Sequence, residues 1–302
     1  MATKYLSILL CLFLVACGSA KPQSEYSYDV LITADPLGWD EYIREIGNVV
    51  QKDGIYYLYY SGHRGPNYRG KPDIYVGVAS SVDGNTWVKH GIVMSDPAED
   101  PHVLVKDGKC YMVYEEKSEI PDRRTSMAES ADCVRFTRTA FGILDYQPNT
   151  WQGSTVSSPA LVDIGSQMAI LYEGTGESNG VANQGKVGLY INGSQLADPV
   201  FSGFGHGWDA FVASDDVIFD NGYYFMTYHA LDTFNGWTSA IAKSKDLLVW
   251  EEIPGGPHFN ADTVMFFRHG GCFKFLTSNG KEITAYYRPD LAYVGIQTCA
   301  KS

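Results

Sequence analysis

The chain has 302 residues, 45% of them hydrophobic and 19% charged, which is long enough to bury the core of one or two domains. Its formal net charge of −12 does not favour binding to nucleic acids or acidic membranes, which are also negative. We therefore expect no nucleic-acid partner. Aromatic residues make up 14% of the chain, and 21 Tyr and 31 Gly favour an all-β protein of Tyr-rich strands and Gly turns.

The N-terminal residues have the features of a targeting segment. Lys4 precedes an apolar run over residues 5–16, shorter than the roughly 20 residues of a membrane-spanning helix. The run ends in Leu14-Val15-Ala16-Cys17-Gly18-Ser19, which is similar to a bacterial lipobox. We expect residues 1–16 to be a lipoprotein signal peptide, Cys17 to be lipidated, and residues 17–27 to be a tether.

This segment predicts export. The lipid would be the chain's only membrane attachment, at the bacterial cell envelope and at the outer membrane if the source is Gram-negative. The alternative is an ordinary signal peptide cleaved near Ala20, which would give a secreted protein.

Six Cys are present, of which Cys11 lies in the leader and Cys17 is the predicted lipid site. An exported chain with four remaining Cys suggests two disulfides, for which the sequence allows three connectivities. We favour Cys110–Cys133 and Cys272–Cys299, since each pair falls inside one sequence repeat. The spacing of these Cys is not that of a zinc site.

The rest of the chain repeats one phrase. An apolar strand, a tight Gly turn and an aromatic strand recur five times at intervals of about 50 residues, with turns at Gly54, Gly108, Gly165, Gly222 and Gly270–Gly271. A Trp-Asp or Trp-Gln pair precedes three of these hairpins, as Trp39-Asp40, Trp151-Gln152 and Trp208-Asp209. A second phrase of the type Ser-x-Asp follows most hairpins, as in Ser81-Val82-Asp83-Gly84.

Four strands per unit at this period predict a five-bladed β-propeller, and a β-sandwich does not usually repeat one phrase at a fixed period. We expect one propeller domain over residues 28–302. The strand predicted at residues 28–33 has no hairpin partner nearby, so it should close the ring by pairing in the last blade.

In a propeller, the starts of the inner strands and the ends of the second strands meet at one mouth of the central channel. Polar side chains fill those positions in every repeat, among them Asp100, Glu173, Asp215 and His229. Clustered carboxylates are what acid–base cleavage of a glycosidic bond requires.

Five blades, the phrase Asp53-Gly54-Ile55-Tyr56-Tyr57-Leu58-Tyr59-Tyr60, the phrase Ser81 to Trp87 and the pair Asp100-Pro101 resemble the five-bladed propeller glycosidases. These are glycoside hydrolase families 43, 32, 62, 117 and 130 and their relatives. In family 43 a blade-one Asp is the general base, a blade-two Asp orients and tunes, and a blade-three Glu is the general acid.

The resemblance carries over residue by residue only in part. Asp100 matches the blade-two Asp. Ser157-Ser158 stand before Pro159, where the blade-three acid would be, and Glu173 is the nearest acid of that blade. Blade one has Ile46-Gly47 in place of Asp-Pro, so the base is left among Asp40, Glu45 and Asp35.

The sequence thus predicts an exported glycosidase that acts on a poly- or oligosaccharide, inverting, as a monomer. The predicted catalytic residues are Asp40, Asp100 and Glu173. The predicted substrate-binding residues are Arg44, Glu45, His63, Arg64, His102, Trp208, Asp209, His229 and Asp262. We expect no cofactor. The alternative is a structural metal ion in the central channel, near His63, His102 and His229.

Three other functions remain open. The missing acid before Pro159 suits a glycan-binding propeller lipoprotein without catalysis. The fold also suits a structural propeller that binds proteins at its rim, and a phosphorylase would need a basic phosphate pocket for which Arg44 and Arg64 are the local candidates.

Overall fold

The computed structural model describes residues 26–66, 73–116, 124–178, 181–232 and 236–301. The predicted signal peptide, Cys17 and most of the tether therefore lie outside the described residues.

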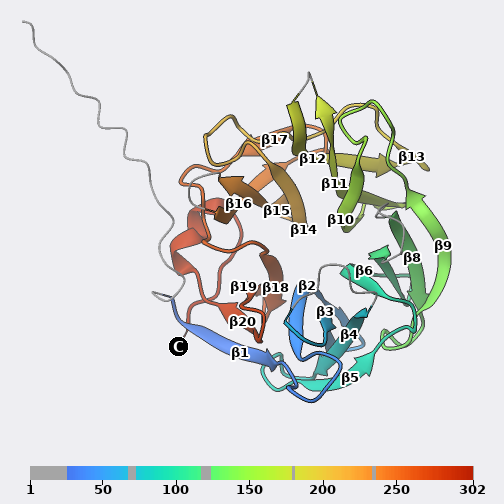
Figure 1. Ribbon diagram of the computed structural model, residues 1–302. Coiled ribbons are helices and arrows are strands. Elements are labelled where there is room, and N and C mark those ends of the chain that lie inside the picture. Colours follow the sequence, from blue (N-terminus) through green and yellow to red (C-terminus); the bar gives the residue numbers. More distant parts are fainter. Residues whose placement is uncertain (1–25, 67–72, 117–123, 179–180, 233–235, 302) are drawn as a thin grey trace, which may run out of the picture.

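Five four-stranded antiparallel sheets stand around a central channel as the blades of a propeller, as predicted (Figure 1). Blade 1 holds β2 (Tyr42–Lys52), β3 (Ile55–His63), β4 (Ile74–Ser81) and β5 (Val88–Ile92). Blade 2 holds β6 (Ala98–Lys106), β7 (Lys109–Glu116), β8 (Arg124–Ser130) and β9 (Thr137–Leu144). Blade 3 holds β10 (Thr155–Asp163), β11 (Met168–Ser178), β12 (Val181–Ile191) and β13 (Ser194–Gln195). Blade 4 holds β14 (Val212–Asp220), β15 (Tyr223–Asp232), β16 (Gly236–Ser244) and β17 (Trp250–Glu252).

The last blade confirms the predicted closure of the ring. It holds β18 (Met265–His269), β19 (Cys272–Ser278) and β20 (Glu282–Tyr286), with β1 (Tyr28–Thr33) added outside β20. A short 3₁₀ helix, η2 (Pro289–Val294), follows β20. The N-terminal strand thus completes a sheet made by the C-terminal part of the chain, which joins the two ends of the ring.

The predicted hairpin turns are present because their residues tolerate a left-handed backbone. Asp53 and Gly54 have φ of 52° and 80°, and Asn221 and Gly222 have φ of 49° and 80°. Two successive positive φ values give the type I′ turn, whose twist matches that of the flanking strands.

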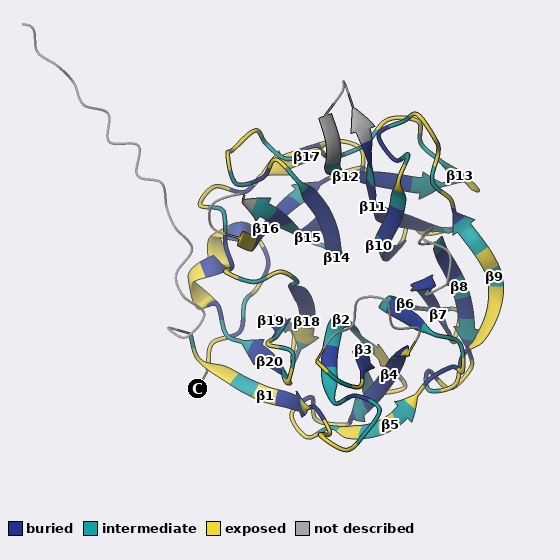
Figure 2. Cartoon of the chain, viewed as in Figure 1, coloured by how far each residue is buried: buried dark blue, intermediate teal, exposed yellow. Residues whose placement is uncertain are grey.

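The core is divided among the interfaces between successive blades. Each of five hydrophobic clusters joins two neighbouring blades, and one of them packs the aromatic side chains of blades 4 and 5. Inner strands are mostly buried and outer strands such as β5 are largely exposed (Figure 2). This layout places the first strand of every blade on the channel wall.

The repeated Trp fixes each of three blades internally. Trp39 stacks on Tyr60 with ring centroids 5.6 Å apart, and Trp151 stacks on Tyr172 at 6.2 Å. A Cβ atom at Gly174 would lie 2.3 Å from the Trp151 ring, so the glycine makes room for the indole. The Trp pairs are therefore packing residues of the blade, common to its repeats.

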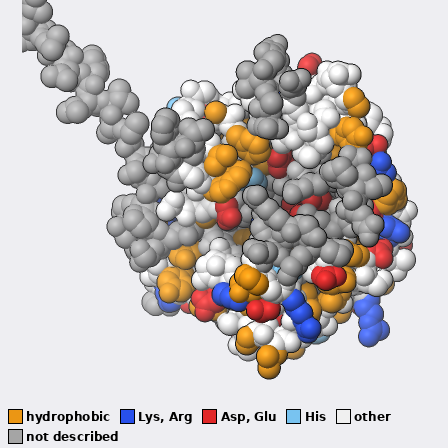
Figure 3. All heavy atoms as spheres, viewed as in Figure 1, with side chains coloured by type: hydrophobic (Ala, Val, Ile, Leu, Met, Phe, Trp, Pro, Cys, Tyr) orange, Lys and Arg blue, Asp and Glu red, His pale blue; other side chains and the backbone are white. Residues whose placement is uncertain are grey.

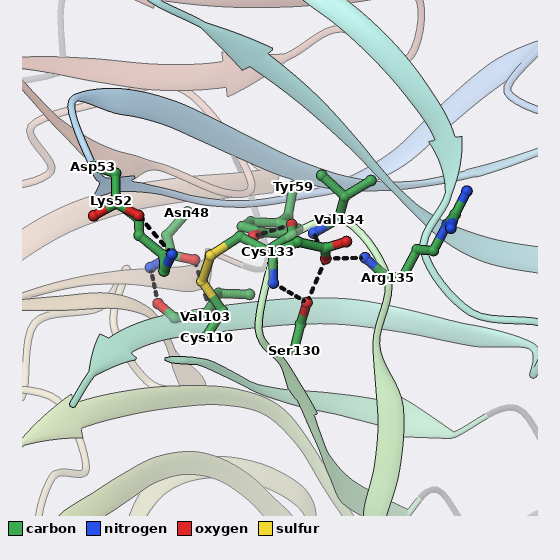
Figure 4. The surroundings of a disulfide bond; sticks show 11 residues. Asn48, Lys52, Asp53, Tyr59, Val103, Cys110, Ser130, Cys133, Val134 and Arg135 are labelled. Atoms are coloured by element: carbon green, nitrogen blue, oxygen red, sulfur yellow. Dashed lines mark hydrogen bonds and ion pairs between the residues drawn. A yellow bond between two sulfur atoms is a disulfide. The ribbon is translucent and has the colours of Figure 1, made fainter. Parts of the chain in front are cut away.

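Both predicted disulfides, Cys110–Cys133 and Cys272–Cys299, are confirmed. The first joins β7 to the turn after β8, and the Tyr59 hydroxyl of blade 1 donates to the Cys133 carbonyl at 2.7 Å (Figure 4). This contact links the cross-linked turn of blade 2 to its neighbour.

Candidate functional site

A pocket of about 350 Å³ lies at one mouth of the channel and receives side chains from all five blades. Its lining residues are Arg44, Glu45, Ile46, Asp100, Pro101, Ser158, Pro159, Glu173, Phe211, Ser214, Asp215, His229, Trp237, Asp262, Thr263 and Met265. Acidic and His side chains gather near the middle of this face (Figure 3). The predicted polar mouth is therefore a hollow to which every blade contributes a carboxylate.

The inner strands of blades 1 to 4 are irregular at the height of the pocket. Their pairing registers shift between Glu99 and His102, between Ser157 and Ala160, and at equivalent places in β2 and β14. Asp100 and Ser158 have φ of 51° and 45° within these bulges. A bulge turns an extra side chain out of the pleat, and such strained positions cluster at functional sites.

One serine hydroxyl connects two carboxylates from neighbouring blades. Ser158 Oγ lies 3.4 Å from Asp100 Oδ2 and 3.4 Å from Glu173 Oε2. Ser157 Oγ also donates to Glu173 Oε2, at 3.1 Å. Ser157 and Ser158, which stand where the blade-three acid of family 43 would be, thus contact Glu173 of the next strand, β11.

Blade 1 supplies a third carboxylate with its own partners. Glu45 forms an ion pair with Arg44 and accepts a hydrogen bond from Thr263 Oγ1 at 3.3 Å. Glu45 thus has a cationic neighbour and comes from a blade that is not adjacent to that of Glu173.

A His–Asp pair from blade 4 completes the site. His229 Nδ1 lies 2.5 Å from Asp215 Oδ1, and Asp215 Oδ2 accepts the backbone N–H of Val264 at 3.0 Å. Burial disfavours the charged imidazolium, but the charge of Asp215 and its hydrogen bond outweigh burial and raise the pKa of His229 to about 9. Burial raises the pKa of Asp215, against the effect of His229. At neutral pH His229 is therefore an imidazolium, hydrogen-bonded to Asp215.

This pair predicts a pH-dependent stability. A folded pKa of about 9 for His229, above its ordinary 6.5, means that the pair stabilises the fold fully below pH 6.5 and that this stability is lost as pH rises through 9. The raised pKa of Asp215 also lowers stability as pH rises, but this loss begins above its ordinary pKa of 3.8. We expect the wild type, measured by urea unfolding, to lose up to about 1.4 kcal/mol per pH unit more than His229→Gln in this window. An equal pH dependence of the free energy of unfolding in the two proteins would contradict a stabilising role of the His229–Asp215 pair.

Six of the predicted site residues line the pocket together: Arg44, Glu45, Asp100, Glu173, His229 and Asp262. They come from all five blades, and the predicted acid Glu173 is among them. The structure brings these residues to one place although they are up to 262 − 44 = 218 positions apart in the chain.

Asp40 lies away from this pocket, inside blade 1. Its Oδ2 accepts hydrogen bonds from the Tyr60 hydroxyl at 2.9 Å and from Lys89 Nζ at 2.7 Å. Gln152 has the matching role in blade 3, where it accepts from the Tyr172 hydroxyl at 2.6 Å. The acid or amide after the repeated Trp is thus a partner for the blade's own tyrosine.

His102 lies in the channel wall below the pocket. Its Nδ1 accepts the backbone N–H of Leu161 at 3.1 Å, and Nε2 lies 2.8 Å from Asp216 Oδ1. Asp216 also accepts the backbone N–H groups of Val217 and Phe266, each at 2.8 Å. This buried network crosses the channel from blade 2 to blade 4 and supports the pocket from beneath.

The remaining four predicted binding residues are not among the residues that line the pocket. His63 is buried and stacks on Tyr42, while the exposed Arg64 donates to the carbonyls of residues 37 and 38. Trp208 stacks on Tyr228, and Asp209 accepts the backbone N–H of Phe204 at 2.6 Å.

Phe211, Trp237 and Thr263 line the pocket but were not predicted to bind substrate, and Asp215 was named only as a mouth residue. Asp215 lies in the buried inner strand β14, a position that could have marked it as a site residue. Phe211 and Trp237 precede or begin strands without a repeated motif, so the sequence offered no signal for them.

Within the described ranges, no group of three or more His, Cys, Asp or Glu side chains is placed to hold a metal ion. In the same part of the chain, no helix is long and apolar enough to cross a membrane.

No protein-family model and no curated protein sequence matches this chain. Solved structures do match. A complex of BT0996 with RGII has a TM-score of 0.68 at 14% identity, over 86% of this protein and 90% of that one. Zg3597, a family 117 glycoside hydrolase of the marine bacterium Zobellia galactanivorans, has a TM-score of 0.61 at 15% identity, over 89% and 97%. A thermostable family-43 glycoside hydrolase has 0.61 at 17% identity, over 81% and 88%. At these identities, the likeness shows a shared propeller fold.

Proposed function

We propose that this protein is a glycoside hydrolase that cleaves a poly- or oligosaccharide in the central pocket. The observation that carries the proposal is the set of carboxylates from blades 1, 2 and 3, held by bulges and serine hydroxyls in one hollow. The similar solved structures include glycoside hydrolases of families 43 and 117, which supports the same reaction class by analogy.

Glu173 is the proposed general acid. Ser157 and Ser158 both contact Oε2, which leaves Oε1 to meet the glycosidic oxygen. Asp100 reaches the acid through Ser158 and would tune and orient it. This gives Asp100 the place of the blade-two Asp in the family 43 pattern.

Glu45 is the proposed general base that activates water. It is paired with Arg44, and blade 2 stands between it and the blade of Glu173. An inverting enzyme needs its two carboxyls roughly 6.5–9.5 Å apart so that a water fits on the far side of the sugar. Carboxyls from non-adjacent blades suit that requirement, so we propose inversion.

Phosphorolysis fits this pocket less well than hydrolysis. Arg44 is already paired with Glu45, and the lining holds further carboxylates at Asp100, Glu173 and Asp262. A phosphate anion would meet an excess of negative charge there.

The second candidate is a glycan-binding propeller lipoprotein without catalysis. The observation that favours it is Ser157-Ser158 at the place where the family 43 acid would stand. A turnover screen separates the two candidates. Residues 21–302 are incubated with plant, algal and bacterial glycans and aryl glycosides, and reducing ends and the anomer of the product are followed by NMR. Hydrolysis with an inverted product supports the proposal; glycan binding by calorimetry without hydrolysis would establish the second candidate.

We further propose that the enzyme is exported and held at the cell envelope by a lipid on Cys17. The support is the lipobox-like sequence that ends the apolar leader. Labelling of the expressed full chain with an alkyne fatty acid tests this. Label that persists in Cys17→Ala would exclude Cys17 as the attachment site.

A further inference from the structure

An aromatic pair stands at the rim of the pocket on blade 4. Trp237, at the start of β16, is 40% exposed, and its ring meets Phe211 at a centroid distance of 5.7 Å and His229 at 5.1 Å. Both contacts are close to perpendicular, at 80° and 78°. Hydrophobic side chains lie over β15 and β16 beside acidic and His side chains in the space-filling view (Figure 3).

The neighbouring blade holds this pair in place. A Cβ atom at Gly185 of β12 would lie 2.6 Å from the Phe211 ring, so the ring lies directly on that glycine. The Phe211 carbonyl also accepts the backbone N–H of Leu231 at 3.2 Å. Trp237 therefore rests against a fixed ring and keeps a large exposed area, which makes it a preorganised apolar surface.

The strand registers place Trp237 above the reacting groups. In blade 4, His229 pairs with Ser239 and Leu231 pairs with Trp237, so Trp237 is two residues nearer the mouth, about 7 Å at the usual strand rise. Glu173 and His229 lie at comparable height, since they pair with Ser157 and Ala213, each within two residues of the register shift in its inner strand. The side chains of His229 and Asp215 are 14% and 1% exposed, consistent with their greater depth.

The pocket thus has a polar lower part and an aromatic rim. The His102–Asp216 network crosses the channel beneath it. A sugar bound below, with its glycosidic oxygen at the level of Glu173, would direct the group attached to that oxygen toward the mouth, where Trp237 stands. An apolar C–H face of a second sugar ring suits an indole, and the polar carboxylates below suit hydroxyls.

We propose that Trp237, supported by Phe211, binds the sugar on the leaving-group side of the scissile bond, so that the substrate is an oligo- or polysaccharide. The inference rests on the proposed glycoside hydrolase function and adds the chemical class of the leaving group. Trp237 is then a specificity-determining residue that acts before and during bond cleavage without exchanging a proton.

Two substrates that share one glycone test this placement. The first is the glycan that the turnover screen identifies, and the second is the glycosyl fluoride of the sugar released from it, which has no leaving-group sugar. We expect Trp237→Ala to lower kcat/KM for the glycan roughly tenfold and to leave kcat/KM for the fluoride unchanged. Trp237→Phe should keep most of the activity on both. Phe219→Ala, which removes a 56% exposed aromatic ring from the other end of β14, is the matched control and should change neither.

Each other result has a definite meaning. An equal loss on both substrates would place the effect of Trp237 on the glycone or on His229 and overturn the inference. Full activity of Trp237→Ala on the glycan would overturn it as well, while leaving the proposed function intact. If the wild type hydrolyses neither substrate, the proposed function fails, and this inference fails with it.

Discussion

Glu173→Gln is expected to lower kcat for an oligosaccharide by about 10²–10⁴-fold, the range typical of general acid catalysis. Glutamine preserves the size of the side chain and can still accept hydrogen bonds from Ser157 and Ser158, but it has no proton to give to the leaving oxygen. The fold should be unaffected, because residue 173 is only partly buried.

The leaving group separates acid catalysis from a binding effect. An aryl glycoside with an acidic phenol needs little protonation, so Glu173→Gln should retain far more activity on it than on the oligosaccharide. Ser157→Ala is the control, since it removes a contact to Glu173 and leaves the carboxyl in place. Equal losses on both kinds of substrate would assign Glu173 to binding and leave the acid to be found elsewhere in the pocket.

His102→Ala is expected to lower the free energy of unfolding by about 1–3 kcal/mol, the usual cost of leaving buried hydrogen-bonding groups without their partner. His102 and Asp216 are 2% exposed, and the change would leave the Asp216 carboxylate without its imidazole and the Leu161 N–H without its acceptor. Urea unfolding of the wild type and the variant, fitted with a common m value, measures the loss.

The chain offers a matched control for this second variant. His206 Nε2 lies 2.8 Å from Glu252 Oε1, the same distance as in the buried pair, but the two side chains are 43% and 44% exposed. His206→Ala should therefore cost no more than about 1 kcal/mol. A similar small loss in His102→Ala would mean that the pair beneath the pocket does not support the fold.

The fold was predictable because each sequence repeat encodes the strands and turns of one blade. Asp-Gly and Asn-Gly turns, aromatic second strands and an interval of about 50 residues are local signals, and they gave the five blades and the closing strand. The disulfides followed from the same repeats, since each pair of Cys lies within one blade.

Pocket residues were predictable at positions whose residue type differs between blades. They were not predictable at positions where the same kind of residue recurs in several blades. Asp40 and Asp209 were chosen as polar residues beside a repeated Trp, but a residue that recurs in several blades tends to serve the blade, as the Asp40–Tyr60 and Gln152–Tyr172 bonds show. Asp100 and Glu173 have no counterpart of the same type in every repeat, and both reach the pocket.

Two features of the site could not be derived from sequence periodicity. The bulges that turn Asp100 and Ser158 into the pocket shift the register within single strands. Phe211 and Trp237 meet the pocket because Gly185 of the preceding blade leaves space for a ring.

The central claim is that this pocket hydrolyses glycosidic bonds, and wild type and Asp100→Asn measured side by side test it most directly. Asn tolerates the left-handed backbone of residue 100 as well as Asp does, so the variant should melt like the wild type. The variant lacks the carboxylate of residue 100, which contacts Ser158, and Ser158 in turn contacts Glu173. We predict release of reducing ends by the wild type and release at least about 100-fold slower in the folded variant. Equal release by the two proteins would contradict the account.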